Sequence, residues 1–198
     1  LQDAIENNKV PEARRFAAYM FDSAEMAIYD AMMRDPQKWL ATQTGERSTA
    51  VNDMIAIALA RVARTDLNAA EELVRTTWAS KLPRLNLQWV YGQFASLAVY
   101  SFDSRAYGWY RETNGIRLSD NNHAWRVRAS LRQAKVDWGW IQRCIDQMGL
   151  PQRNDPAWVY WKARALAAQG KEKDAQALYE SIAHQINFYG QLSSEELG

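Results

Sequence analysis

The chain has 198 residues, of which 47% are hydrophobic and 24% charged, and its formal net charge at pH 7 is +1. This composition is ordinary for a globular domain and gives no strong attraction to nucleic acid or to an anionic membrane. The single cysteine, Cys144, excludes an internal disulfide, and no apolar run is long enough to span a membrane. Because the chain begins with Leu1 rather than Met, we expect it to be a processed or truncated piece.

Helical periodicity runs through the first half of the chain. Residues 11–21 place four residues on one apolar face: Ala13, Phe16, Ala17 and Met20. The helix that Ser23 caps is expected to bury four residues: Ala27, Ile28, Ala31 and Met32. The clearest stripe runs from Val51 to Val62 and predicts a long buried helix. A further helix is expected to bury five residues: Leu87, Tyr91, Phe94, Ala98 and Phe102. No segment alternates apolar and polar residues as a strand does, so we expect almost no strand.

The last third of the chain contains distinct helix boundaries. Asp155 is predicted to cap a helix that begins at Pro156, and Gly170 to end it in the left-handed conformation. This helix is expected to bury one face: Trp158, Trp161, Ala165 and Ala168. A second helix follows from Glu172 to about residue 186, and a third covers about residues 188–197. Helices joined by such short connections predict an antiparallel hairpin.

A repeat is visible at the turns between helices. Four residues stand there at intervals of 37, 34 and 34 positions: Asp66, Asp103, Asp137 and Lys171. Four positions after each of them stands a residue suited to a buried helix face: Ala70, Tyr107, Ile141 and Ala175. A period near 34 with this content is typical of stacked helical hairpins. The predicted fold is therefore an all-α superhelix, or solenoid, of stacked antiparallel hairpins.

The chain from about residue 120 onward also resembles a known family. The segments that carry the resemblance follow one another in this order: Ala124-Trp125-Arg126-Val127-Arg128, Asp137-Trp138, Trp158-x-x-Trp161-Lys-Ala-Arg-Ala-Leu, Gly170, Ala177-Leu178-Tyr179-Glu180, Asn187-Phe188-Tyr189-Gly190-Gln191-Leu192 and Glu195-Glu196-Leu197-Gly198. Together they are similar to the region before the catalytic domain in soluble lytic murein transglycosylases of Gram-negative bacteria. The likeness covers roughly residues 120–198, and upstream of it only the helical pattern is shared.

The resemblance implies a periplasmic protein whose parent cleaves peptidoglycan. Members of the family break the bond between N-acetylmuramic acid and N-acetylglucosamine without water and leave a 1,6-anhydro end, with one glutamic acid serving as acid and then base. Their lysozyme-like catalytic domain would begin after Gly198. Residues 1–118 are then part of an α-superhelical domain, and residues 119–198 are linker-type hairpins that lead to the catalytic domain.

The expected role of this chain is non-catalytic: it would hold the catalytic domain and guide glycan strands or partners such as cell-wall synthesis proteins. A different class stays open, in which the chain is a stand-alone helical-repeat adaptor that binds a peptide. A nucleic-acid binder is less favoured, because basic residues are interspersed with acidic ones. No cofactor is expected.

No residue is assigned a catalytic role. Glu180-Ser181 matches the Glu-Ser pair of the family's catalytic acid, but Leu178-Tyr179 stands where the family has Arg-Gln, so Glu180 is expected to face solvent. His123 and His184, the only histidines, cannot form a structural zinc site with one cysteine, and both are expected near helix ends. Cys144 lies on an apolar stripe and is expected in the core.

Aromatic residues supply the candidate binding positions. Three tryptophans are candidates for stacking on sugar rings: Trp109, Trp138 and Trp140. The alternative is that these rings fill the space between hairpins. Trp138 and Trp140 are two positions apart on a predicted helix, so they cannot both face inward. Three residues are candidates for docking the catalytic domain, with the aromatic rings partly bare in this chain: Phe188, Tyr189 and Gln191.

Overall fold

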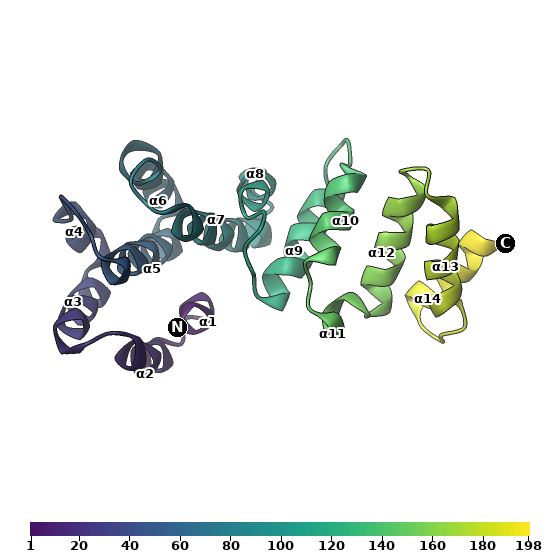
Figure 1. The fold of residues 1–198 in the computed structure, drawn as a ribbon. Helices are drawn as coiled ribbons and strands as arrows, with labels where there is room; N and C mark the ends of the chain where they lie inside the picture. The colour runs from purple at the N-terminus through teal and green to yellow at the C-terminus, as the bar shows by residue number, and fades with distance from the viewer. The chain divides into compact units, whose positions relative to one another are not determined.

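The computed structural model describes residues 1–198, and its regular structure is entirely helical, as the sequence predicts. The chain divides into two compact units, Leu1–Ile116 and Arg117–Gly198 (Figure 1). The domain boundary expected after residue 118 and the roles expected of the two parts stay predictions.

The first unit contains short and long helices joined by tight turns. In chain order they are α1 (Gln2–Glu6), α2 (Val10–Met20), α3 (Ser23–Arg34), α4 (Pro36–Ala41), α5 (Thr49–Thr65), α6 (Leu67–Leu73), the π-helical η1 (Val74–Trp78), α7 (Arg84–Ala98), the 3-10 turn η2 (Val99–Ser101) and α8 (Arg105–Glu112). Helix α4, which Asp35 caps through the Lys38 N–H, is not predicted from the sequence because the proline at its start reads as a break.

Helix α5 forms the centre of the first unit. The Ser48 side chain accepts a hydrogen bond from the Val51 N–H and caps it, and α5 packs against α3, α4, α6 and α7. From Met54 to Ala63 every residue except Arg61 is buried. A helix that is apolar nearly all round must be enclosed by neighbours, and the predicted long buried helix is confirmed.

Helices α2 and α3 bury only some of the residues predicted: Ala13, Ala17 and Met32 are buried as expected, and the other predicted residues are not. In α2 the small residues Ala13 and Ala17 are buried, whereas Phe16 and Met20 are 43% and 55% exposed. In α3 the buried residues are Tyr29 and Met32, while Ala27 and Ile28 are exposed, and Asp22 rather than Ser23 supplies the cap. Alanine lets α2 approach its neighbours closely, and the larger Tyr29 ring takes the inward position that the pattern assigned to Ile28.

The stripe predicted for α7 is correct for Phe94 and Ala98 and wrong for Phe102. Helix α7 ends at Ala98, and the η2 turn changes the direction of the chain before residue 102. Phe102 is 79% exposed and has a φ of +57°, in the left-handed region. A helical pattern extended past the true helix end therefore placed this ring in the core.

The second unit is a series of helical hairpins. Its helices are α9 (Asp120–Leu131), α10 (Trp138–Asp146), α11 (Leu150–Arg153), α12 (Pro156–Ala167), α13 (Glu172–Ala183) and α14 (Phe188–Leu197). Helix α10 packs against α9 and α12, α12 packs against α13, and α13 packs against α14 (Figure 1). Each hairpin thus covers an apolar face of the next.

The residues at the predicted repeat positions all stand where a helix begins. Asp66 and Asp137 cap α6 and α10 by accepting hydrogen bonds from backbone N–H groups, and Lys171 directly precedes α13. The Asp103 side chain accepts from the Arg105 N–H at 2.9 Å, at the start of α8. The repeat read from the sequence is therefore a repeat of helix starts.

Candidate functional site

The C-terminal assembly of α12, α13 and α14 is built by Asp155 and Gly170, which the sequence indicates, and by Asn187, whose capping role is not predicted from the sequence. Asp155 accepts a hydrogen bond from the Ala157 N–H at the start of α12, and Gly170 has a φ of +75° after its end. Asn187 caps α14 by accepting from the Gly190 N–H at 2.9 Å. These three boundaries set the directions in which the chain turns between the helices.

Tyr160 is at the centre of this assembly. It is 4% exposed, and its ring centroid lies 5.9 Å from that of Tyr179 and 5.7 Å from that of Tyr189. The buried residues around it come from α12 and α13: Ala163, Leu166, Ala175, Tyr179 and Ile182. The α12 stripe predicted from the sequence is only partly correct, because Trp161 is half-buried and Ala168 is exposed. Helix α12 packs between α10 and α13, so it buries two faces rather than one.

A hydrogen-bonded set of three polar side chains lies at the edge of the same core. The Tyr160 hydroxyl donates to Glu196 Oε1 at 3.3 Å, and Arg164 Nη1 donates to the Tyr160 hydroxyl at 3.1 Å and to Glu196 at 3.0 Å. Burial, with a smaller contribution from the Glu196 carboxylate, raises the pKa of Tyr179 to about 12. Tyr179 and Glu196 also line a hollow of about 250 Å³ between α13 and α14. This group links the end of α14 to α12.

The docking candidates lie on α14, and they differ in exposure. Phe188 is 66% exposed, and Ile186 just before it is fully exposed. Tyr189 is half-buried against Tyr160, and the Gln191 side chain donates to Glu195 on the exposed face of α14. The start of α14 therefore presents an apolar surface to solvent, with Phe188 as its aromatic part.

The tryptophan candidates also differ in exposure. Trp109 is 7% exposed and packs edge to face on Phe94 at 5.5 Å, and Trp140 is 2% exposed and donates its indole N–H to the Ser130 hydroxyl at 3.1 Å. Trp138 is half-buried at the start of α10. Trp140 thus faces inward and Trp138 is less buried, in agreement with the expectation that the two cannot both face inward.

The other residues considered as functional candidates are Glu180, Cys144, His123 and His184, and the structure places each of them. Glu180 is exposed and accepts a hydrogen bond from Gln176 one turn before it. No group of three or more His, Cys, Asp or Glu residues could hold a metal ion. Cys144 is buried, as its apolar stripe predicts, and His184 follows the end of α13. His123 is buried in the first turns of α9, and burial followed by the charges of Arg126 and Arg117 lowers its pKa to about 4.

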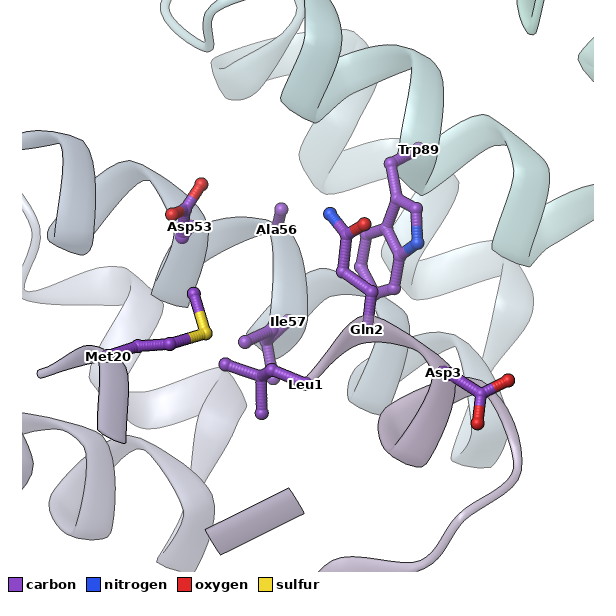
Figure 2. Close-up of a pocket in the computed structure, with 8 residues that line it drawn as sticks. All are labelled: Leu1, Gln2, Asp3, Met20, Asp53, Ala56, Ile57 and Trp89. Carbon is purple, nitrogen blue, oxygen red and sulfur yellow. The ribbon is translucent and has the colours of Figure 1, made fainter. Parts of the chain in front are cut away.

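A pocket of about 270 Å³ in the first unit is not indicated by the sequence. Figure 2 shows the Asp53 carboxylate, the Met20 sulfur and the Trp89 ring around it, with Ala56 and Ile57 on α5. Asp53 accepts a hydrogen bond from the Asn86 amide at 2.7 Å, which orients its carboxylate. These residues come from α2, α5 and α7, and no spacing along the chain predicts their meeting.

The fold places this chain among all-α proteins built from stacked helical hairpins. Neither a scan against family models nor a search of curated proteins finds a match. Among solved structures, the lytic transglycosylase Slt of Pseudomonas aeruginosa, determined as an inactive mutant, matches with a TM-score of 0.60 and 24% identity. That match covers 99% of this chain and 32% of the Pseudomonas chain. The 70 kDa soluble lytic transglycosylase Slt70 of Escherichia coli matches with a TM-score of 0.49 and 16% identity, covering 100% of this chain and 32% of that one.

The likeness to the Pseudomonas protein is a likeness of fold. It confirms the predicted all-α superhelix of stacked hairpins, and it agrees with the resemblance to lytic transglycosylases seen in the sequence. The chain spans about one third of the length of either matched protein. No helix has the length and the hydropathy needed to cross a membrane.

Proposed function

We propose that this chain is the non-catalytic α-superhelical part of a periplasmic lytic transglycosylase, an enzyme that cleaves peptidoglycan glycan strands to 1,6-anhydro-muropeptides. The chain holds the catalytic domain in place and guides glycan strands or partner proteins toward it. The observation that carries the proposal is the fold match to a lytic transglycosylase over 99% of this chain at a TM-score of 0.60. The family-like segments between Asp155 and Gly198 support it independently.

The catalytic domain docks on the exposed start of α14 in this proposal. Phe188 supplies a bare aromatic ring, Gln191 supplies an exposed amide, and Tyr189 ties the surface to the core through Tyr160. An exposed apolar surface of this kind loses unfavourable contact with water when a domain covers it. Fixing the docking surface to a packed core would hold the catalytic domain in one orientation.

Glycan guidance is assigned to Trp138 in this proposal. Of the three tryptophan candidates it has the most accessible ring, and flat aromatic faces stack well on the apolar faces of sugar rings. Binding of the chain to purified sacculi should weaken in Trp138→Ala. The matched control is Trp140→Phe, because that ring is buried, so the change should leave sacculus binding unchanged if the variant remains folded. Equal binding by all three proteins would remove Trp138 from the proposal.

The activity test uses this chain alone and the longer parent protein. Incubation with sacculi, followed by separation of muropeptides, should give 1,6-anhydro products with the parent and none above a no-protein control with this chain alone. A catalytic acid needs a position against the scissile bond and a pKa suited to proton transfer, whereas Glu180 is exposed and bonded to Gln176. Product from the chain alone that disappears in Glu180→Gln would contradict the proposal.

The docking surface is tested in the parent protein. Phe188→Ser should leave the unfolding midpoint of this chain almost unchanged, because the ring is 66% exposed. In the parent the same change should lower the unfolding temperature of the catalytic domain and its activity on sacculi. Gln176→Ser, on an exposed position of α13, is the control and should change neither. Tight binding of peptides, no binding to sacculi and no activity of the parent on sacculi would instead favour a stand-alone adaptor.

A further inference from the structure

Helix α9 carries an arginine that lies against two tryptophan rings. The Cζ atom of Arg128 is 5.2 Å from the ring centroid of Trp125 and 5.4 Å from that of Trp158 on α12. Both distances are within the range of a cation–π contact. Because the two rings belong to different helices, they restrict the guanidinium more than one ring would, and less conformational entropy is left to lose when it binds a ligand.

Arg128 is exposed and has no carboxylate partner, unlike the arginines of the chain that are held in ion pairs. Arg14, Arg75 and Arg105 each form an ion pair with an aspartate or a glutamate. A guanidinium that touches aromatic faces still has its N–H edge available for hydrogen bonds in the plane of the group. Arg128 is therefore an oriented donor without an acceptor from the protein.

The segment that contains Arg128, residues 117–135, has more basic than acidic residues, although the whole chain is nearly neutral. Between residues 117 and 135 the only acidic residue is Asp120, against four exposed cations: Arg117, Arg128, Arg132 and Lys135. The Cζ atom of Arg132 lies 5.4 Å from the same Trp125 ring. A local excess of one charge attracts ligands of the opposite charge.

We propose that Arg128, Trp125 and Trp158 form a binding site for a peptide carboxylate, with Arg132 at its edge. The guanidinium receives the carboxylate through paired N–H···O bonds, and the half-buried Trp125 ring gives an apolar surface for the residue that carries it. Arg128 lies in the last turn of α9, at the negative end of the helix dipole. That position disfavours a doubly charged phosphate more than a singly charged carboxylate. The site does not depend on the proposed function.

The test follows the indole N–H signals of the intact 198-residue chain by NMR during titration with acetyl-Ala-Ala-Ala. The peptide with a free carboxylate should shift the signals of Trp125 and Trp158, and added sodium chloride should weaken the effect. The same peptide with an amidated end should shift them far less. Equal shifts with the amidated peptide, or shifts with inorganic phosphate and none with the carboxylate, would overturn the proposal.

Variants locate the effect at Arg128. Arg128→Gln should weaken binding of the free-acid peptide about tenfold or more, since a charge-assisted hydrogen bond pair is lost. Arg128→Lys should weaken it less, because the charge remains and the planar fork does not. The matched control is Arg143→Gln, another exposed arginine whose Cζ lies 5.7 Å from one tryptophan ring, that of Trp140. Wild-type affinity in both Arg128 variants, or an equal loss in the Arg143 variant, would overturn the proposal.

Discussion

The backbone carbonyl oxygen of Gln185 lies 2.1 Å from the position that a Cβ atom on Gly190 would occupy. The carbonyl oxygen of Ile182 is also close, at 2.9 Å. Both atoms belong to the backbone, Ile182 in the last turn of α13 and Gln185 just after it, so neither can rotate away as a side chain would. The start of α14 reaches this position because residue 190 has no side chain. Gly190 thereby sets where Phe188 and Tyr189 lie.

Gly190→Ala should destabilise the C-terminal assembly. The methyl group forces α14 away from the end of α13 and disturbs the contact between Tyr189 and Tyr160, and overpacking of this kind costs about 1–3 kcal/mol or more. Urea unfolding followed by circular dichroism should show a lower midpoint. In the docking proposal, the same variant should also weaken the hold on the catalytic domain.

Gly108→Ala is the matched control for this prediction. Gly108 lies inside α8, and a Cβ atom there meets no atom within 4 Å. Alanine favours the helix over glycine by about 0.5–1 kcal/mol, so this change should be neutral or stabilising. A Gly190→Ala midpoint as high as that of Gly108→Ala would show that α14 does not pack so closely on α13.

Tyr160→Ala should cost about 3–5 kcal/mol, in the range measured for large aromatic side chains removed from cores. The ring packs against Tyr179 and Tyr189, and its hydroxyl group joins Arg164 to Glu196. Tyr160→Phe isolates the hydroxyl and should cost about 0.5–1.5 kcal/mol. The free energies of unfolding from urea titration give both values.

Trp161→Ala serves for comparison with Tyr160→Ala, because Trp161 is the residue that the helical stripe in the sequence places in the core. It is half-buried in the structure, so its removal should cost less than that of Tyr160. A larger loss of unfolding free energy in Trp161→Ala than in Tyr160→Ala would mean that Trp161, and not Tyr160, is the main core residue of α12.

The sequence predicts the helix boundaries of the second unit well because each one depends on a local residue type. Asp155 and Gly170 act on backbone groups close to them in the chain, so their effect can be read without the tertiary structure. The Asn187 cap is equally local, although it is not among the predictions. The repeat of helix starts is local in the same way. Buried faces are less well predicted, since a face is chosen by the neighbouring helices. Helix α12 has a neighbour on each side, and no single stripe describes it.

The candidate sites show the same contrast between features set by local sequence and features set by tertiary contacts. The alternation of Trp138 and Trp140 is a property of one helix and could be predicted, although which of the two faces inward could not. The pocket beside Asp53 and the contact of Arg128 with Trp158 join helices distant in the chain. No residue in either site has a motif spacing, so sequence reasoning could not have found them.

Phe102→Gly should raise the stability of the first unit. A left-handed backbone costs a residue with a Cβ atom about 1–2 kcal/mol, and glycine avoids this cost while losing about 0.5–1 kcal/mol through its flexibility. Since the ring is 79% exposed, little packing is lost with it. The net gain should be about 0.5–1 kcal/mol, seen as a higher midpoint in thermal unfolding.

Tyr100→Gly is the control for Phe102. Tyr100 is 60% exposed in the η2 turn, and its φ is not positive, so glycine there relieves no left-handed backbone and adds the entropic loss. This variant should be less stable than the wild type. Destabilisation of similar size at both positions would mean that Phe102 gains more from its surroundings than its backbone conformation costs.

His123 should make the stability of the second unit depend on pH. Burial and the charges of Arg126 and Arg117 lower the pKa of His123 to about 4, whereas an unfolded histidine titrates near pH 6.5. The geometry agrees, because Arg126 Nη2 lies 3.0 Å from His123 Nδ1 and the Leu118 N–H points to Nε2, so an added proton would face donors. The folded protein keeps the imidazole neutral.

The sign of the effect follows from proton binding. Between about pH 6.5 and pH 4 the unfolded chain binds a proton that the folded chain does not, so the free energy of unfolding falls as the pH falls, by up to about 1.4 kcal/mol per pH unit. The contribution is complete above pH 6.5 and lost below about pH 4.

Urea midpoints measured from pH 7.5 to pH 4 should show this slope in the wild type and a flatter one in His123→Gln. His184→Gln, changed at an exposed residue after α13, should keep the wild-type slope, and carboxylate titrations cancel because all three proteins share them. Parallel curves for the wild type and His123→Gln would show that His123 binds a proton equally well in the folded and unfolded chains.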